Sequence, residues 1–391
     1  MSLSIKTEMP GLKTPVCLIL DDSSPGEKNY LEFVEEFSKL VSETKIKGKF
    51  TLMPYPSPVA LDEALAGKQL PVLQKTVSLI RENIAPYFDI SPEILTHNQI
   101  VDLKTGLYHY PCISEEEWSQ TQNKEALTAY IAYGLNILKN VGLEANGVTS
   151  PSHFGSEVED SYARAVLEAE KKINNISLTW YFLHVDKDSP VINPKVSYLN
   201  KTKKEAVVSI ISGYGDYIKD EEEEEFAKYT DQYISEDGEK GRLATLYQCG
   251  SCLVFHHHWW RMIREEKLEF KILYEVTRRL RNVYGDKIRW MKVSEISRYF
   301  ATQNSFEVNI RENGETQSLE FKSPFICPEF TISLTAEENN KNISITKDGE
   351  LLNELNKGET LKKDSWFLKN KRIYLCFDLS YENTIRVQRK K

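Results

Sequence analysis

Short apolar runs alternate with longer helical patterns over about the first 300 residues, and this alternation constrains the fold more than any other feature. The run Val16–Leu20 is wholly apolar, which is typical of a strand buried on both faces. The segment Tyr30–Glu43 then carries apolar residues at helical spacing. The same alternation predicts strands at Gly48–Leu52, Glu93–Thr96, Asn146–Thr149, Ser177–Leu183, Val207–Ile211, Leu253–Phe255 and Ile288–Met291, and helices at Leu70–Ile84, Glu115–Val141, Val158–Lys172 and Leu268–Tyr284. Seven or eight such units predict an α/β fold, a TIM-like (β/α) barrel rather than an open sheet.

The strand–helix alternation of the sequence ends at about residue 303. Short alternating runs, such as Phe306–Ile310 and Arg372–Asp378, are separated by the hairpin signals Asn313-Gly314 and Asp348-Gly349. We therefore expect a barrel domain over residues 1–302 and a small all-β, sandwich-like domain over residues 303–391. The second domain is expected to pack against the barrel, with carbohydrate binding as the alternative.

Charge and hydropathy exclude several classes of protein. The chain has 50 basic and 58 acidic residues, a net charge of −8 and a pI near 5.6. Nucleic-acid and anionic-membrane binders carry the opposite balance, so we expect neither partner. No apolar stretch is long enough to cross a membrane, and the first 15 residues lack the apolar run of a signal peptide. We expect a cytoplasmic protein, or an exported one if a leader has been trimmed, and we make no prediction of its oligomeric state.

Two further features are assigned no chemistry. The Cys249-Gly250-Ser251-Cys252 motif runs into an apolar strand rather than opening a helix, so both thiols are expected to be packing groups. The acidic run at residues 220–225 is expected to be a solvated segment.

Polar residues follow several predicted strands at the point where each strand ends. They include Asp21-Asp22, His97, Ser150, His184 and the run His256–His258. In a barrel of parallel strands these ends lie on one face, which is the face that carries active sites. Adjacent carboxylates after a buried strand are costly unless a metal or a shared proton compensates them. The alternative for Asp21-Asp22 is a plain turn, because Ser, Pro and Gly follow.

The order of four segments resembles the motif order of the metal-dependent polysaccharide deacetylases, carbohydrate esterase family 4 of the glycoside hydrolase/deacetylase superfamily. The segments are LILDDSS, EILTHNQ, GVTSPSHFG and LVFHHHWW, and the resemblance covers about residues 14–300. It implies the deacetylase type of barrel. It also implies Asp21 as the general base and Asp22 and His97 as metal ligands.

The sequence departs from the family pattern at three places. Val101 occupies the position of the second metal-binding His, so Asp102 is the expected third ligand, with His153 and His109 as rivals. The third motif, at residues 149–151, lacks the Arg that orients the base in the family. The last motif has three His where the family needs one acid. His256 and His258 would share one face of a strand, opposite His257. We take His258 as the acid, with His256 second.

The resemblance implies a hydrolase that removes an acetyl or related acyl group from an amino sugar or glycan. Its cofactor would be one divalent metal ion, most simply Zn²⁺, although Asp and His ligands also suit Co²⁺, Ni²⁺, Mn²⁺ or Fe²⁺. The expected substrate-binding residues are Ser150, His153, His184 and Trp259, the last as a wall of the pocket.

Two other hypotheses stay open. A glycosidase of the same superfamily would need two carboxylates, and Asp21 with Asp186 or Asp216 could serve. A non-catalytic barrel that binds a glycan or a partner would account for the missing His and Arg.

Overall fold

The computed structural model describes residues 4–56, 59–67, 70–216, 226–264, 267–313, 316–335, 343–356 and 358–389. The chain divides into two compact units. The α/β unit comprises Pro15–Tyr198 and Ala206–Ser297, and the β unit comprises Met1–Thr14, Leu199–Glu205 and Arg298–Lys391. The acidic run at 220–225 lies outside the described residues.

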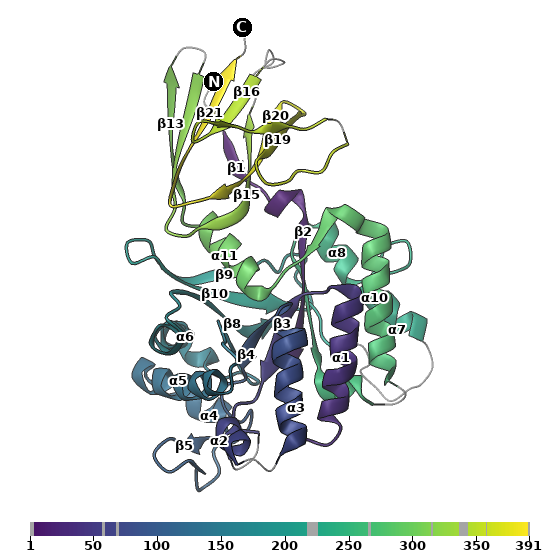
Figure 1. Cartoon of the computed structure of the whole chain (residues 1–391), viewed down its shortest axis with the longest axis vertical. Coiled ribbons are helices and arrows are strands. Elements are labelled where there is room, and N and C mark those ends of the chain that lie inside the picture. The colour runs from purple at the N-terminus through teal and green to yellow at the C-terminus, as the bar shows by residue number, and fades with distance from the viewer. Residues whose placement is uncertain are drawn as a thin grey trace. The chain divides into compact units, whose positions relative to one another are not determined.

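The α/β unit contains two sheets built mainly from parallel strands (Figure 1). The first has the order β11-β2-β3-β4, with β12 also pairing with β2, and the second has the order β7-β8-β10-β9. The strands are β2 (Thr14–Asp21), β3 (Gly48–Leu52), β4 (Phe88–Pro92), β7 (Val148–Thr149), β8 (Leu178–Val185), β9 (Lys195–Asn200), β10 (Glu205–Ser212), β11 (Leu253–His258) and β12 (Ile288–Trp290). A short antiparallel hairpin, β5 (Val101–Asp102) with β6 (Leu107–Tyr108), follows β4.

Isolated parallel bridges join the two sheets of the α/β unit to each other at two places. The bridges Ile90↔Ala145 and Glu93↔Thr149 connect the β4 region to the β7 region, and Gly215↔His256 connects the segment after β10 to β11. The register within the first sheet pairs His258 with Asp21. The carboxyl ends of β2, β4, β7 and β11 are therefore neighbours.

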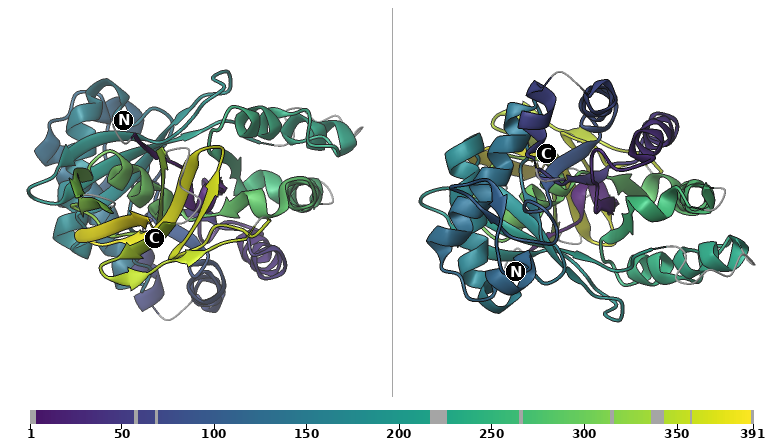
Figure 2. Two further views of the ribbon diagram at one scale, coloured as in Figure 1. Left: turned by 90° about the horizontal axis from the view of Figure 1, so that it is seen from above. Right: turned by 90° about the horizontal axis from the view of Figure 1, so that it is seen from below.

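Amphipathic helices cover the outer side of these strands (Figures 1 and 2). In α1, for example, Phe33, Val34 and Phe37 are fully buried, because they recur on one face of the helix. The helices are α1 (Tyr30–Thr44), α2 (Leu61–Ala66), α3 (Pro71–Leu79), α4 (Glu115–Ser119), α5 (Lys124–Asn140), α6 (Glu159–Asn174), α7 (Phe226–Tyr233), α8 (Arg242–Gln248), α9 (Trp259–Met262) and α10 (Leu268–Tyr284). A further helix, α11 (Val293–Gln303), begins in the α/β unit and ends in the β unit.

The structure corrects two of the predicted elements. The third strand is Phe88–Pro92, and the predicted Glu93–Thr96 segment instead forms a turn with Ile94 at φ 49°. The single helix expected over Glu115–Val141 is two helices, α4 and α5. The break comes where the Asn123 side chain accepts a hydrogen bond from the Ala126 N–H and caps a new helix.

The β unit consists of two five-stranded sheets, in which all strand pairs except β18–β19 are antiparallel. Their orders are β1-β15-β20-β19-β18 and β13-β14-β21-β16-β17. One apolar core lies between them, where Phe321 of one sheet meets Phe377 of the other at 5.6 Å between ring centroids. The strands are β1 (Ile5–Thr7), β13 (Glu307–Asn313), β14 (Thr316–Lys322), β15 (Cys327–Thr335), β16 (Ile343–Lys347), β17 (Glu350–Leu351), β18 (Asn353–Glu354), β19 (Ser365–Lys369), β20 (Arg372–Leu379) and β21 (Glu382–Arg389). This is the sandwich-like architecture expected of an all-β region.

The described residues include the whole of one of the two predicted hairpin turns of the β unit. Asp348-Gly349 forms the turn between β16 and β17, as predicted. Gly314 of the other signal lies outside the described residues.

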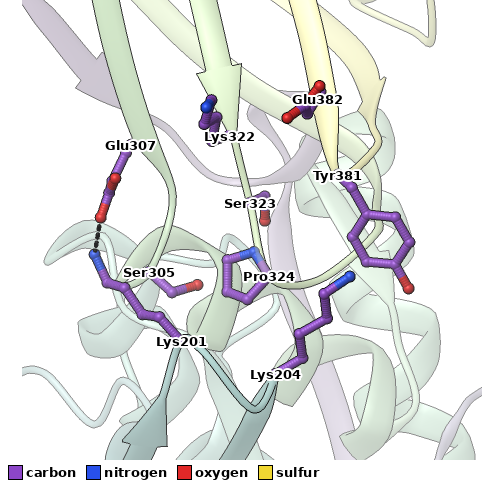
Figure 3. Close-up of a pocket in the computed structure, with 9 residues that line it drawn as sticks. All are labelled: Lys201, Lys204, Ser305, Glu307, Lys322, Ser323, Pro324, Tyr381 and Glu382. Atoms are coloured by element: carbon purple, nitrogen blue, oxygen red, sulfur yellow. Dashed lines mark hydrogen bonds and ion pairs between the residues drawn. The ribbon is translucent and has the colours of Figure 1, made fainter.

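The β unit also carries an open surface pocket of about 330 Å³ (Figure 3). Two of the lysines that line it have partners within the pocket: Lys201 pairs with Glu307 at 2.9 Å, and the Lys204 ammonium lies 3.5 Å from the centroid of the Tyr381 ring. We assign this pocket no ligand.

Two observations bear on other sequence expectations. Among the described residues, no helix has the length and hydropathy needed to span a membrane. Cys252 is fully buried, and burial raises the pKa of its thiol, as suits a packing group. Cys249 is exposed, so the prediction of a packing thiol is wrong for this residue.

Candidate active site

The first element of the site is a buried ion pair at the end of β2. The Asp21 carboxylate Oδ1 accepts hydrogen bonds from the Lys49 ammonium and, at 3.0 Å, from the Thr51 hydroxyl. Lys49 is fully buried and Asp21 is 4% exposed. Burial acts to raise the pKa of Asp21, but the charges of Lys49 and His256 outweigh it, and the pKa lies below its usual value. Asp21 is therefore an ionised carboxylate, which is the state a general base requires.

Asp22 turns away from its neighbour. Its backbone is left-handed, at φ 59°, so its side chain does not follow the alternation of the strand. The backbone N–H of Asp22 donates to Glu93 Oε2 at 2.9 Å, and Oδ2 accepts from the indole N–H of Trp260 at 3.1 Å. The two adjacent carboxylates thus face different partners.

The segment after β4 brings Glu93 and His97 to Asp22. Glu93 Oε1 lies 2.9 Å from His97 Nδ1, and His97 Nδ1 lies 3.5 Å from Asp22 Oδ1. His97 has φ 70°, a backbone conformation that is rare outside glycine and is common at functional sites. The buried Glu115 carboxylate anchors the segment, because it accepts a hydrogen bond from the Thr96 N–H at 3.0 Å.

These charges shift one another's protonation. Burial and the Asp22 carboxylate raise the pKa of Glu93 to about 7. Burial works against protonation of His97, but its hydrogen bond to Glu93 outweighs burial and raises the pKa of His97 to about 9. The imidazole of His97 thus offsets the charge of the two carboxylates, Glu93 and Asp22, that lie beside it.

Asp22, Glu93 and His97 fit a divalent metal ion. Each offers one ligand atom, and the three atoms lie within 4.8 Å of one another. The donor set of two carboxylates and one imidazole suits Zn²⁺ and the other first-row divalent ions. The third candidate ligand in the structure is therefore Glu93, whereas the sequence predicted Asp102 for this role.

The second titratable centre of the site is His258 with Asp216. His258 Nδ1 lies 2.8 Å from Asp216 Oδ1, and the opposite ring nitrogen, Nε2, lies 3.7 Å from Asp22 Oδ2. Burial works against protonation of His258, but the hydrogen bond to Asp216 and the Asp22 charge outweigh it and raise its pKa to about 9. His258 therefore holds its proton at neutral pH, with Asp216 fixing the orientation of the ring.

His256 lies on the same side of β11 as His258, with ring centroids 5.7 Å apart. Its Nδ1 lies 2.9 Å from the Ser212 hydroxyl, and burial lowers its pKa. A Cβ on Gly215 would lie 2.1 Å from this ring, so glycine is needed for the close approach. His257 points the other way and is fully buried, 3.3 Å from the Tyr233 hydroxyl.

Three of the sequence candidates have exposed side chains. Asp102 is exposed, and its Oδ1 accepts the backbone N–H groups of Lys104 and Thr105 within a turn. His109 and His153 are exposed as well. The metal-competent cluster contains none of these three residues.

The structure gives the expected substrate-binding residues different surroundings. Ser150 is buried, with its hydroxyl 2.7 Å from that of Tyr162, and His184 is half-buried with Nε2 2.9 Å from Glu159. Trp259 packs in the core, 4.9 Å from the Tyr30 ring. Its neighbour Trp260 is the tryptophan that contacts Asp22.

Sequence reasoning missed Glu93 and Lys49 as site residues. The spacing of Glu93 four residues before His97 was a signal, because a carboxylate and an imidazole commonly pair at a metal site. Lys49 gave a weaker one, a lone lysine within an otherwise uncharged predicted strand.

Comparisons with known proteins gave structural matches only. No family model matches the chain, and no curated protein matches its sequence. One similar solved structure is the "putative polysaccharide deacetylase from Mycobacterium smegmatis", with 12% identity and a TM-score of 0.45 over 76% of this chain and 94% of that one. Another is the maltogenic α-amylase AmyB from Thermotoga neapolitana, with 10% identity and a TM-score of 0.35 over 98% of this chain and 100% of that one. The family 30 xylanase Xyn30A from Clostridium acetobutylicum matches with 8% identity and a TM-score of 0.30 over 98% and 97%. Likeness at this level does not assign an activity to this chain.

Proposed function

We propose that this protein is a metal-dependent hydrolase that removes an acetyl or related acyl group from an amino sugar or glycan. One observation carries the proposal. The Asp21 carboxylate, the cluster of Asp22, Glu93 and His97, and His258 with its partner Asp216 converge at neighbouring strand ends. These are the parts that metal-assisted acyl hydrolysis requires.

We infer that the strands of the α/β unit close into a (β/α) barrel that displays this site at its carboxyl-terminal face. The support is the set of parallel bridges that link β4 to β7 and the end of β10 to β11. These bridges and the pairing of β11 with β2 give each strand from β2 to β11 a neighbour on both sides. The exceptions are the hairpin strands β5, β6 and β9. An active site at this face is the rule for such barrels.

Asp22, His97 and Glu93 would hold the metal ion, with Zn²⁺ as the first candidate. When bound, such an ion polarises an acyl carbonyl and makes a water molecule more acidic.

Asp21 would accept the proton of the attacking water. Its Oδ1 is occupied by Lys49 and Thr51, which leaves Oδ2 for the water. His258 would then donate the proton at Nε2 to the departing amine or alcohol, because Nδ1 is engaged by Asp216. A general base for the water and a general acid for the leaving group are what such a hydrolysis needs.

The carboxylates of the glycosidase hypothesis have other partners. Asp186 accepts hydrogen bonds from the Ser189 hydroxyl and two backbone N–H groups, and Asp216 is paired with His258. These contacts favour the hydrolysis of an acyl group over that of a glycosidic bond.

Acetate release tests the proposal. N-acetylglucosamine, tri-N-acetylchitotriose and O-acetylated xylo-oligosaccharides would be offered to the wild type and to Asp21→Asn, with Asp186→Asn as the matched control. We expect release by the wild type and the control, loss on chelation, recovery with added metal, and a fall of about 100-fold or more in Asp21→Asn. Release that persists undiminished in chelator, or in Asp21→Asn, would contradict the mechanism.

A further inference from the structure

Among the described residues of the α/β unit, Lys49 is the lysine that is completely buried, and no role in the site was predicted for it from the sequence. Lys49 lies on β3, where it is 0% exposed. Its ammonium donates to three oxygens: Asp21 Oδ1, the Thr51 hydroxyl at 2.8 Å and the Thr149 hydroxyl at 2.6 Å. An ammonium has three N–H donors, so each donor has a partner.

The sheet geometry aims this charge at Asp21. A Cβ at Gly48 would lie 1.7 Å from the Leu18 carbonyl oxygen, so only glycine allows β3 to approach β2 this closely. Thr149 is held in turn by the Ser91 hydroxyl at 3.0 Å, and the Phe182 ring lies 4.9 Å from the ammonium. Contacts with residues of β2, β7 and β8 thus fix the position of the Lys49 side chain.

A buried ion pair is a poor way to stabilise a fold. Apolar side chains of similar volume are commonly as stabilising or more so, because both charges lose their hydration. The burial of the Lys49–Asp21 pair therefore points to a role beyond packing.

The contacts of Asp21 indicate what that role is. Oδ1 accepts two hydrogen bonds, whereas no donor among the described residues reaches Oδ2. The Asp21 side chain is 6% exposed, so the carboxylate is not fully sealed from solvent. Oδ1 of Asp21 is therefore held by hydrogen bonds, whereas Oδ2 is available to accept a proton.

We propose that Lys49 is the positioning residue of the general base: it anchors Asp21 Oδ1 and so turns Oδ2 toward the attacking water. This inference rests on the proposed function. Lys49 touches neither the substrate position nor the cluster of Asp22, Glu93 and His97, so its loss should affect the chemical step rather than metal binding. A displacement of the base by about 1 Å can cost on the order of 100-fold in rate.

The test compares Lys49→Met with Lys47→Met by steady-state kinetics on whichever acetylated probe named above the wild type hydrolyses. Lys47 lies two residues away and pairs with Glu295 at 3.2 Å near the surface. In Lys49→Met we expect kcat to fall on the order of 100-fold with KM and metal content unchanged. Lys47→Met should match the wild type. Thr149→Val, which removes one acceptor of the ammonium while keeping its shape, serves if Lys49→Met does not fold, and it too should lower kcat alone.

The outcomes separate the two proposals. A wild type that releases no acetate from any probe contradicts the proposed function and this inference with it. An active wild type whose folded Lys49→Met variant keeps its kcat, or loses its metal along with activity, overturns the positioning role alone. If only Thr149→Val folds, an unchanged kcat in that variant overturns it as well.

Discussion

Glu93 and His97 are joined by a hydrogen bond of 2.9 Å between Oε1 and Nδ1, while the second oxygen of Glu93 accepts the Asp22 backbone N–H at the same distance. One carboxylate therefore holds two strand ends together at the candidate metal site. Its burial and its negative neighbours make this arrangement costly in the absence of a cation.

Glu93→Gln should weaken metal binding. The substitution keeps the shape but removes the charge and changes the partner of His97, so we expect zinc affinity to fall about 10- to 100-fold. Competition with a chromophoric chelator measures it. Glu82→Gln, at an exposed position, is the control, and equal affinity of the two variants would show that Glu93 takes no part in the site.

Asp216→Asn should impair the proposed acid. Without the carboxylate, His258 loses both its orientation and the charge that favours its protonated form. We expect kcat to fall on the order of 100-fold. Asp186→Asn, a substitution in a loop of the same unit, should leave kcat unchanged, and a similar loss in both variants would argue against a specific role for Asp216.

The neighbours Trp259 and Trp260 should behave differently in unfolding experiments. Trp259 is 2% exposed and packs against Tyr30 and Phe33, so Trp259→Ala should lower the free energy of unfolding by about 3–5 kcal/mol. Trp260 is half-buried and contacts Asp22, so Trp260→Ala should cost distinctly less. Urea unfolding of both variants measures the difference, and equal losses would contradict the placement of these rings.

The stability of the protein should depend on pH through Glu170. This α6 residue is fully buried, and burial raises the pKa of its carboxyl to about 8 from an ordinary value of 4.5. The folded state thus holds the proton more tightly than the unfolded state, so this residue makes the free energy of unfolding fall as pH rises from about 4.5 to 8.

Glu170→Gln removes this dependence. At pH 8 the variant should be more stable than the wild type by at least about 1.4 kcal/mol, the equivalent of a one-unit shift. Below pH 4.5 the difference should vanish. Urea unfolding across this range measures it, and a constant difference at all pH values would refute the assignment.

Local patterns predicted the strand–helix alternation because burial imposes a visible period on the sequence. The apolar run Val16–Leu20 lies within β2. The strand predicted at Glu93–Thr96 was wrong. The residues of this segment are typical of a strand, but they form a turn in which Ile94 and the following His97 take left-handed conformations. A turn that tertiary contacts hold in place leaves no periodic signal.

The same limit applies to the site. Asp21, Asp22 and His97 stand out because they follow apolar runs directly. Lys49 does not, because an isolated lysine in a strand is normally a solvent-facing residue. Only the pairing of β3 with β2 and the approach of β7 reveal that its partners surround it.

Metal content tests the central claim most directly. Elemental analysis of tag-free wild type and of His97→Ala, each after incubation with Zn²⁺, Co²⁺ or Ni²⁺ and desalting, gives the number of ions per chain. We expect about one divalent ion in the wild type, lost in His97→Ala, because one of three converging ligands is removed. A wild type that retains no ion under any of these conditions would contradict the metal-dependent mechanism.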